Sequence, residues 1–173
     1  VGWTVGPEEG VIAASRAAVN WSGRQYGPWG LSHASAFEIA KGAAEGVLMV
    51  QTDLPNPFME RNSSFLRGYA KLGTERPIGS ILSAAPPSDP GHLLLRALCQ
   101  SNGDISGKGL KNALENLPQP YRGVVTTYDR PFSRTDHDAI SSNMLWMGTW
   151  QGGERTYAYK EDAVRASVIR RKE

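Results

Sequence analysis

The sequence predicts an α/β protein built on a parallel, doubly wound sheet. Over the first fifty or so residues, short apolar runs alternate with segments of helical periodicity in the order strand, helix, strand, helix, strand. This order is typical of a parallel sheet with helices on both faces. The apolar run at residues 47–51 has the character of a strand that is covered on both sides. A composition with 40% hydrophobic and 21% charged residues excludes disordered and fibrous classes.

The first strand is expected at residues 1–5, with a helix directly after it. Gly6 and Pro7 turn the chain, and proline is tolerated in the first turn of a helix because an N–H would have no partner there. Glu8 and Glu9 favour the positive end of the helix dipole. Apolar residues then recur at helical spacing. Because Trp-Ser-Gly at residues 21–23 breaks this pattern, we expect the helix to end near Asn20.

A second short strand is expected at residues 24–26, followed by a tight turn at residues 27–30, which are Gly-Pro-Trp-Gly. Residues 32–35 offer N-cap side chains for a helix over 34–41. Residues 52–57 hold two prolines in a polar run, which can continue neither a helix nor a central strand. That segment is interpreted as a linker.

Beyond the linker the sequence predicts helices and then strands. Asp89 is expected to cap a helix that has Pro90 at its first position, after a loop or short extended segment at residues 77–85. Residues 151–153 favour a hairpin turn. The further helices are expected over residues 58–72, 91–100, 106–116 and 161–171, and the strands over 124–128, 144–150 and 155–159.

Charge and cysteine content exclude several kinds of function. The net charge is +2, and the only basic cluster, at residues 165–172, is expected to be a solvated tail, so neither nucleic-acid binding nor membrane insertion is expected. The single cysteine, Cys99, excludes an internal disulfide and any multi-cysteine metal site. No apolar run reaches the ~18 residues of a membrane-spanning helix. The chain shows no signal peptide and opens within a strand, which favours a fragment.

Two turns at the carboxyl ends of strands are candidate binding positions, because ligands of open α/β sheets bind there. Trp29 lies in the second turn. Its ring either fills the core or stacks on a planar ligand. His33, beside the same turn, is either a cap or surface group or faces a ligand.

No catalytic, cofactor or metal site is predicted. The three histidines show no spacing that suggests a hydrolase triad, and the chain has no G-x-S-x-G elbow, no H-E-x-x-H motif and no phosphate-binding glycine loop. Asp136 and Asp138 flank His137, but this pattern is a weak metal signal, and the two carboxylates are expected to cap and charge a turn. The chain is therefore not expected to be an enzyme.

Four stretches, taken in order, resemble the second half of type I periplasmic substrate-binding proteins of ABC importers. They are G-P-E-E-G at residues 6–10, G-P-W-G-L-S at 27–32, G-A-A-E-G-V-L at 42–48, and T-Y-D-R-P-F-S with T-D-H-D-A-I at 127–140. The group most similar to the chain is that of the branched-chain amino-acid (Leu/Ile/Val) receptors. The resemblance covers nearly the whole chain.

This resemblance implies two α/β lobes joined by a hinge, with a small-molecule ligand in the cleft between them. Residues 1–54 would belong to an incomplete C-terminal lobe, 55–138 to part of the N-terminal lobe, 139–160 to the return into the C-terminal lobe, and 161–173 to a basic tail. The implied location is periplasmic. The implied partners are an importer permease and the missing N-terminal half of the receptor.

The resemblance also places the ligand contacts. The matching positions are Thr4, Val5 and Gly6 after the first strand, and Trp29 and Gly30 in the turn. Amino-acid-binding relatives have an acid in place of Trp29 and an aromatic residue near the position of Val5, and this chain has neither. Because an unpaired ammonium in a closing cleft is costly, the expected ligand is a planar or aromatic carboxylate stacked on Trp29, with His33 as a donor.

The chain departs from the family at Pro86 and Pro87, where relatives have an unbroken helix start. Two other functions remain open at this stage. One is a ligand-sensing regulatory domain of the same fold. The other is a small α/β hydrolase that uses Ser32 or His33.

Overall fold

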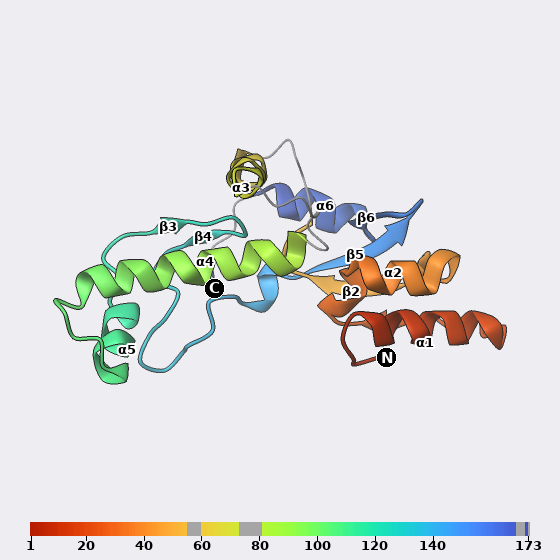
Figure 1. The fold of residues 1–173 in the computed structure, drawn as a ribbon, viewed down its shortest axis with the longest axis horizontal. Helices are drawn as coiled ribbons and strands as arrows, with labels where there is room; N and C mark the ends of the chain where they lie inside the picture. The colour runs from red at the N-terminus through yellow and green to blue at the C-terminus, as the bar shows by residue number, and fades with distance from the viewer. Residues whose placement is uncertain (55–59, 73–80, 169–171, 173) are drawn as a thin grey trace. The chain divides into compact units, whose positions relative to one another are not determined.

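The computed structural model describes residues 1–54, 60–72, 81–168 and 172 (Figure 1). The chain forms two compact units. Unit 1 comprises Val1–Ala84 and Leu145–Val168, and unit 2 comprises Ala85–Met144 and Ile169–Glu173. Unit 1 therefore extends past residue 54, where the first boundary was expected. Part of the predicted linker, at residues 55–57, lies outside the described residues.

Unit 1 is built on a four-stranded sheet in the order β1-β2-β5-β6. β1 (Tyr26–Gly27) and β2 (Leu48–Gln51) are parallel, as predicted. β5 (Trp146–Gln151) and β6 (Glu154–Tyr157) form the predicted hairpin, and each runs antiparallel to its neighbours. The α/β class is confirmed, but the sheet is mixed, because a two-residue turn at Gly152 and Gly153 joins only antiparallel strands.

Residues 1–5, predicted as the first strand, form no strand. Their one hydrogen bond to β1 runs from the N–H of Gly2 to the carbonyl of Tyr26, at 2.9 Å. The N–H of Thr4 donates instead to a carboxylate oxygen of Glu9, also at 2.9 Å. A strand needs a continuous ladder with its neighbour, and here a side chain takes the bond that would continue it.

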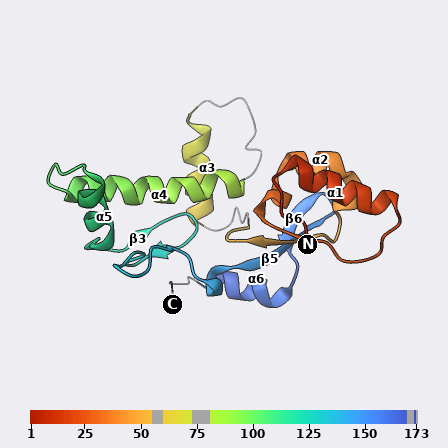
Figure 2. The same ribbon diagram turned by 90° about the horizontal axis from the view of Figure 1, so that it is seen from below.

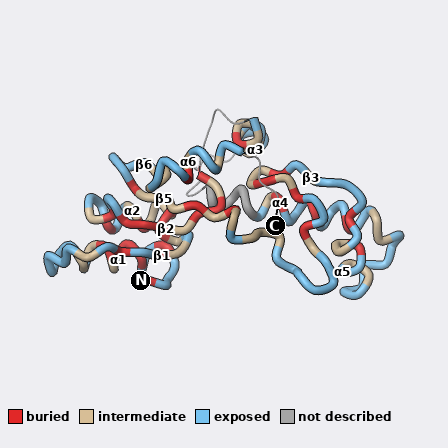
Figure 3. Tube along the Cα trace, turned by 180° about the vertical axis from the view of Figure 1, so that it is seen from behind, coloured by how far each residue is buried: buried red, intermediate tan, exposed pale blue. Residues whose placement is uncertain are grey.

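Helices cover both faces of the sheet. α1 (Pro7–Ala18) and α2 (Ala34–Ala40) lie side by side on one face, and α6 (Lys160–Ser167) lies on the other (Figures 1 and 2). Both α1 and α2 were predicted. The core between α1, α2 and the sheet contains Ala13, Leu31, Ala40, Ala44, Val47, Met49 and Trp150. Figure 3 shows these buried stretches along β2, β5 and the facing turns of the helices.

The segment expected to be a basic tail contains α6, which packs on the sheet. Asp162 in its first turn is buried and accepts a hydrogen bond from the N–H of Met147 at 2.9 Å. Arg165 lies over the ring of Trp146, 5.4 Å from its centroid. A helix was also predicted here, and both its amphipathic spacing and this packing oppose a solvated tail. Residues 169–171 lie outside the described residues.

The environment of Tyr157 on β6 leads us to expect that the stability of the folded chain falls at alkaline pH. Burial, together with the charges of Asp53 and Asp162, raises the pKa of Tyr157 to about 12. The phenol of an unfolded chain ionises near ~10, so the folded state holds this proton more tightly. We therefore expect this contribution to be intact below about pH 10 and to be lost as the pH rises from about 10 to about 12.

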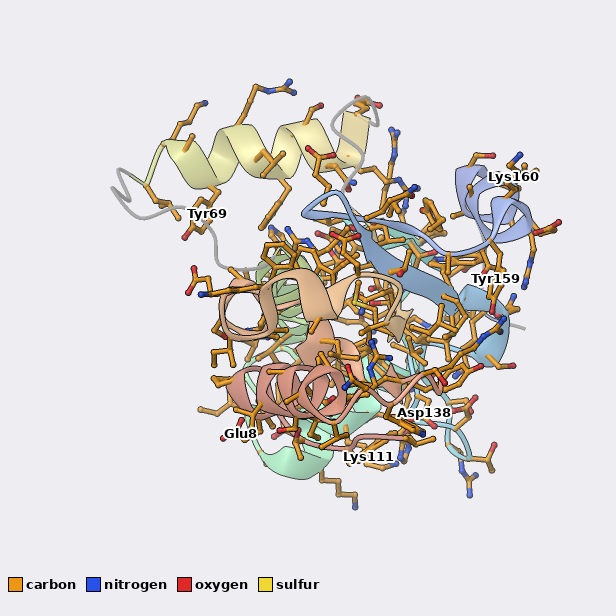
Figure 4. The ribbon with its side chains drawn as sticks, turned by 90° about the vertical axis from the view of Figure 1, so that its right-hand side faces the viewer. Glu8, Tyr69, Lys111, Asp138, Tyr159 and Lys160 are labelled. Atoms are coloured by element: carbon orange, nitrogen blue, oxygen red, sulfur yellow. The ribbon has the colours of Figure 1, made fainter. Side chains whose placement is uncertain are left out.

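The measurement is urea unfolding across that pH range, with tyrosinate absorbance recorded in parallel. Tyr157→Phe should remove this part of the pH dependence, whereas Tyr159→Phe should keep it, because Tyr159 is exposed where α6 begins (Figure 4). Equal alkaline losses in the wild type and in Tyr157→Phe would contradict the prediction.

The remaining helix of unit 1, α3 (Glu60–Ala70), confirms the helix predicted at 58–72 over its described residues. Unit 2 holds α5 (Gly107–Glu115), which begins at Ser106 as predicted, where the hydroxyl accepts from the N–H of Gly109 at 3.1 Å. Most of α4 (Ile81–Gln100) also lies in unit 2. The unit 2 core consists of Leu93, Ala97, Ala113, Leu117 and Tyr128.

α4 begins ten residues before the predicted start at residue 91, so the loop expected at 77–85 is wrong where it is described. Pro86, Pro87 and Pro90 lie within the helix. Their fixed φ is itself helical, so the backbone continues at the cost of the hydrogen bonds that proline cannot donate. Asp89, predicted as a cap, instead points into unit 2 as a fully buried side chain.

The strand predicted at residues 124–128 is only partly present. β4 (Thr127–Tyr128) pairs with β3 (Tyr121–Arg122), which was not predicted, and the two are antiparallel. Val124 and Val125 lie in the connection, where both N–H groups donate to Asp89. A side chain again replaces the bonds that a longer strand would have made.

Candidate functional site

The two candidate turns lie directly against each other in unit 1. A Cβ atom placed on Gly30 would be 2.8 Å from the backbone nitrogen of Gly6, 3.3 Å from the carbonyl of Thr4 and 3.4 Å from the Cα of Val5. Real Cβ atoms do not approach a backbone this closely, so glycine is needed at position 30. The structure thus brings together residues that are more than twenty positions apart in the sequence.

His33 lies next to the same contact. A Cβ on Gly6 would be 3.8 Å from the Cβ of His33 and 3.4 Å from the hydroxyl of Ser35. His33 occupies the position before α2, but its side chain does not cap that helix. We call the six predicted residues Thr4, Val5, Gly6, Trp29, Gly30 and His33 the Trp29 face.

The Trp29 face is apolar and open. The side chain of Trp29 is 48% exposed and that of Val5 is 71% exposed. Trp29 is therefore not a core residue, and its ring is accessible for stacking. Trp3, one residue before the face, is also exposed. Glu8 follows the Gly6-Pro7 turn and lies on the outer side of α1 (Figure 4).

Three side chains hold the carbonyls of the turn at Trp29–Ser32. The hydroxyl of Ser32 donates to the carbonyl of Trp29 at 2.7 Å. The indole N–H of Trp150 donates to the carbonyl of Leu31 at 2.7 Å, and the guanidinium of Arg155 donates to the carbonyl of Ser32 at 3.1 Å. Sequence reasoning missed Trp150 and Arg155, because they follow the turn by more than a hundred residues and belong to no motif.

The side chain of Glu9 supports the other candidate turn, the one at Thr4–Gly6. It is fully buried, and one carboxylate oxygen accepts from the N–H of Thr4 at 2.9 Å. The other oxygen has no hydrogen-bond partner among the described residues. A Cβ on Gly2 would lie 2.8 Å from that oxygen and a Cβ on Gly27 would lie 3.0 Å from it, so two glycines make room for the carboxylate. The sequence suggested only a helix-dipole role for Glu9.

The geometry opposes a serine hydrolase at this position. Ser32 is fully buried, and its hydroxyl is engaged with the carbonyl of Trp29. A nucleophile must be able to reach the substrate and hand its proton to a base. Ser32 is instead a structural part of the turn.

The histidine pattern at residues 136–138 belongs to unit 2 and makes ion pairs. His137 Nε2 lies 2.9 Å from the Glu115 carboxylate, which also pairs with Lys111. Hydrogen bonds from Lys111 and His137 lower the pKa of Glu115. Asp136 accepts from the N–H of Asp138 at 3.0 Å, which is the turn role expected for it. Within the described ranges, no group of three or more potential ligands could hold a metal ion.

None of the helices in the described ranges is long and apolar enough to cross a membrane.

No family model matches the sequence, and no curated protein is significantly similar to it. Solved structures do match. A type 1 periplasmic binding protein from Bordetella pertussis Tohama I has a TM-score of 0.71 at 21% identity, over 90% of this chain and 44% of that one.

Two further similar structures are those of ligand-binding proteins. The leucine-binding protein LivK from Thermotoga maritima MSB8 has a TM-score of 0.67 at 18% identity, over 91% of this chain and 43% of that one. An ABC transporter solute-binding protein from R. palustris, solved with benzoate, has a TM-score of 0.64 at 16% identity, over 90% and 41%. This chain spans less than half the length of each. It has the fold of that part of a type I periplasmic binding protein.

Proposed function

We propose that the chain is part of an extracytoplasmic receptor that binds a small organic solute and delivers it to the permease of an ABC importer. The observation that carries the proposal is the Trp29 face, where two loops at the expected binding edge meet and present a half-exposed indole. The fold match agrees with a binding protein of this kind. Its location would be periplasmic. Ligand contacts from both lobes would favour the closed arrangement of the cleft over the open one.

The proposed ligand is a planar or aromatic carboxylate. An exposed indole offers a flat apolar surface for a ring, and an aromatic pair contributes about 0.5–1.5 kcal/mol beyond the apolar area that it buries. Trp29 also stands where the resemblance places the acid of amino-acid receptors, so the ammonium of an amino acid would lack its partner on this side. The benzoate complex of the R. palustris protein shows that this fold accommodates an aromatic acid.

The proposed receptor includes a second segment that completes unit 2. In α4, Leu93 and Ala97 are buried, whereas Leu94, Leu95 and Leu98 on another side of the helix are 42%, 59% and 36% exposed. A helix that is apolar on two sides is typical of one packed between two layers. We propose that the rest of the N-terminal lobe covers these leucines. The proposed lobes divide at residues 54 and 138, whereas the compact units divide after residues 84 and 144.

Calorimetry on the receptor that contains this chain tests the ligand class, with benzoate and leucine as probes. Benzoate is expected to bind and leucine to bind weakly. Trp29→Ala should weaken benzoate binding by about tenfold to a hundredfold, because both the stacking contact and its buried area are lost.

Trp21→Ala is the matched control. Trp21 is similarly exposed, at 57%, but its ring packs against Gly23 at the end of α1 and not on the Trp29 face. It should leave the benzoate affinity unchanged. Tight leucine binding without benzoate binding would overturn the proposed ligand class, and an absence of binding to any carboxylate or amino acid would overturn the receptor function.

A further inference from the structure

The backbone hydrogen bonds inside the turn that carries Trp29 and His33 are of the weaker 3₁₀ type. Within it, the N–H of Leu31 donates to the carbonyl of Pro28 at 3.2 Å and the N–H of His33 donates to that of Gly30 at 3.1 Å. A 3₁₀ helix is usually short, and its hydrogen bonds are less well aligned than those of an α-helix. The carbonyls of Leu31 and Ser32 point away from the turn to Trp150 and Arg155. Both residues belong to the β5–β6 hairpin.

Trp150 is a fixed donor. Its side chain is 6% exposed and its ring lies 4.6 Å from that of Phe37, centroid to centroid. A buried indole packed in this way has little rotational freedom, so the direction of its N–H is set by the core. The bond to Leu31 is short, at 2.7 Å, and buried. The indole therefore defines where the carbonyl of Leu31 must lie.

Arg155 holds the next carbonyl of the turn, that of Ser32, in the same way. Its guanidinium lies over the Trp150 ring, 5.7 Å from the centroid, and donates to the carbonyl next in sequence to the one that Trp150 binds. Arg155 is only partly exposed, and this burial lowers the pKa of its guanidinium. A planar, stacked guanidinium loses little freedom when it forms such a bond.

The hairpin that supplies both donors is itself fastened to the rest of unit 1. The N–H groups of Gly152 and Gly153 each donate to the carboxylate of Glu45 at 3.0 Å, and the N–H of Gly46 donates to the carbonyl of Trp150 at 3.2 Å. Both hairpin glycines have positive φ, which lets their N–H groups turn toward one carboxylate. Trp150 and Arg155 thus stand on a rigid frame.

We propose that Trp150 and Arg155 are positioning residues of the ligand site. They fix the carbonyls of Leu31 and Ser32, and through them the orientation of Trp29 and His33, without touching the ligand. The sequence between the turn and the hairpin includes residues 85–144 of unit 2, so the site is complete only when the chain has returned to unit 1. This inference rests on the proposed function, because it assigns a purpose to the Trp29 face.

Trp150→Phe tests the first donor, since it keeps an aromatic ring and removes the N–H. Trp146→Phe is the matched control, because Trp146 is buried on the same strand at 7% exposure and lies four residues away from Trp150. Trp150→Phe should weaken benzoate binding by about tenfold, and Trp146→Phe should not. Arg155→Met should act like Trp150→Phe, with part of the affinity restored in Arg155→Lys, which keeps a donor.

A double-mutant comparison separates positioning from a general loss of stability. When Trp29 is already alanine, Trp150→Phe should cause a smaller further loss of benzoate affinity, because one of the two side chains that it positions is gone. An equal loss in both backgrounds, or equal effects of Trp150→Phe and Trp146→Phe, would overturn the proposal.

Hydrogen exchange gives a readout that needs no ligand. The amides of Leu31 and His33 should exchange about tenfold faster in Trp150→Phe, while the amide of Leu48, which donates to the carbonyl of Gln25 in the sheet at 3.0 Å, should be unchanged. If the wild type binds no benzoate but these amides respond, the proposed ligand fails and the positioning stands. If binding is seen and the amides do not respond, the positioning fails alone.

Discussion

Asp89→Ala is expected to destabilise unit 2 by about 3–5 kcal/mol. The Asp89 side chain is fully buried and accepts three hydrogen bonds, from the N–H of Val124 at 2.7 Å, the N–H of Val125 at 2.9 Å and the hydroxyl of Tyr128 at 3.0 Å. Alanine would remove the acceptor of one buried and two part-buried donors, and a buried donor that loses its acceptor costs about 1–3 kcal/mol. The β3–β4 hairpin and its connection would lose these three hydrogen bonds to α4.

Two milder variants grade the effect. Tyr128→Phe removes one of the three donors and should cost about 1 kcal/mol, since the carboxylate keeps its two backbone bonds. Asp89→Asn keeps the size but replaces one acceptor oxygen with a donating amide, so it should fall between Tyr128→Phe and Asp89→Ala. The control is Asp104→Ala, because Asp104 is an exposed carboxylate that also accepts a backbone N–H, from Ser106 at 3.0 Å.

The measurement is urea unfolding with two probes. All five tryptophans lie in unit 1, so their fluorescence follows that unit, whereas circular dichroism and the exchange of the Val124 and Val125 amides follow unit 2 as well. Asp89→Ala should lower the midpoint seen by the second set of probes, and Asp104→Ala should leave it in place. Equal shifts in the two aspartate variants would show that the buried carboxylate has no special role.

Asp89 also shows why one part of the fold could not be predicted. An Asp-Pro pair before an apolar helical pattern is a good local indication of a helix start, and by local criteria Asp89 was a cap. The contact that decides its role is made with residues 35 and 36 positions away. Nothing in the sequence around Asp89 indicates that contact, so the prediction placed the start of α4 ten residues too late.

The helices that were predicted well are those whose determinants are local. α1 has a proline in its first turn and acidic residues at its start, and α5 has Ser106 as its cap. Strands depend on partners elsewhere in the chain. Residues 1–5 have strand-like composition but lose their ladder to the carboxylate of Glu9, and the antiparallel direction of β5 is fixed only by its pairing with β2.

The residues of the Trp29 face were predicted from a strand-end rule together with the family resemblance, whereas the residues that support the face were not predicted. The rule expected a strand at residues 1–5, which the structure does not have, yet Gly6 and Gly30 do meet. Trp150, Arg155 and Glu9 act through buried hydrogen bonds that join distant segments. Such bonds leave no pattern in the residue types, and a tryptophan that is largely buried does not by itself indicate a binding site.

Gly10→Ala is expected to destabilise unit 1 by about 1–3 kcal/mol, although the same change inside an exposed helix normally stabilises it. A Cβ on Gly10 would lie 2.5 Å from the carbonyl oxygen of Ala36 and 3.0 Å from the Cβ of Ile39. The obstacle is the backbone of α2, which cannot rotate away as a side chain could. α1 and α2 must therefore separate.

Gly68→Ala in α3 serves as the control, because it should stabilise unit 1 where Gly10→Ala destabilises it. Outside the local backbone of α3, no atom of the described residues lies within 4 Å of a Cβ at Gly68, so alanine there should raise the free energy of unfolding by about 0.5–1 kcal/mol through its better helix propensity. Urea unfolding of the two variants tests the pair. α2 begins one residue after His33, so the separation caused by Gly10→Ala should also disturb the Trp29 face and weaken benzoate binding, while Gly68→Ala leaves it intact. Stabilisation by both substitutions would mean that the two helices are not in close contact at Gly10, and the packing that places His33 beside Gly6 would lose its support.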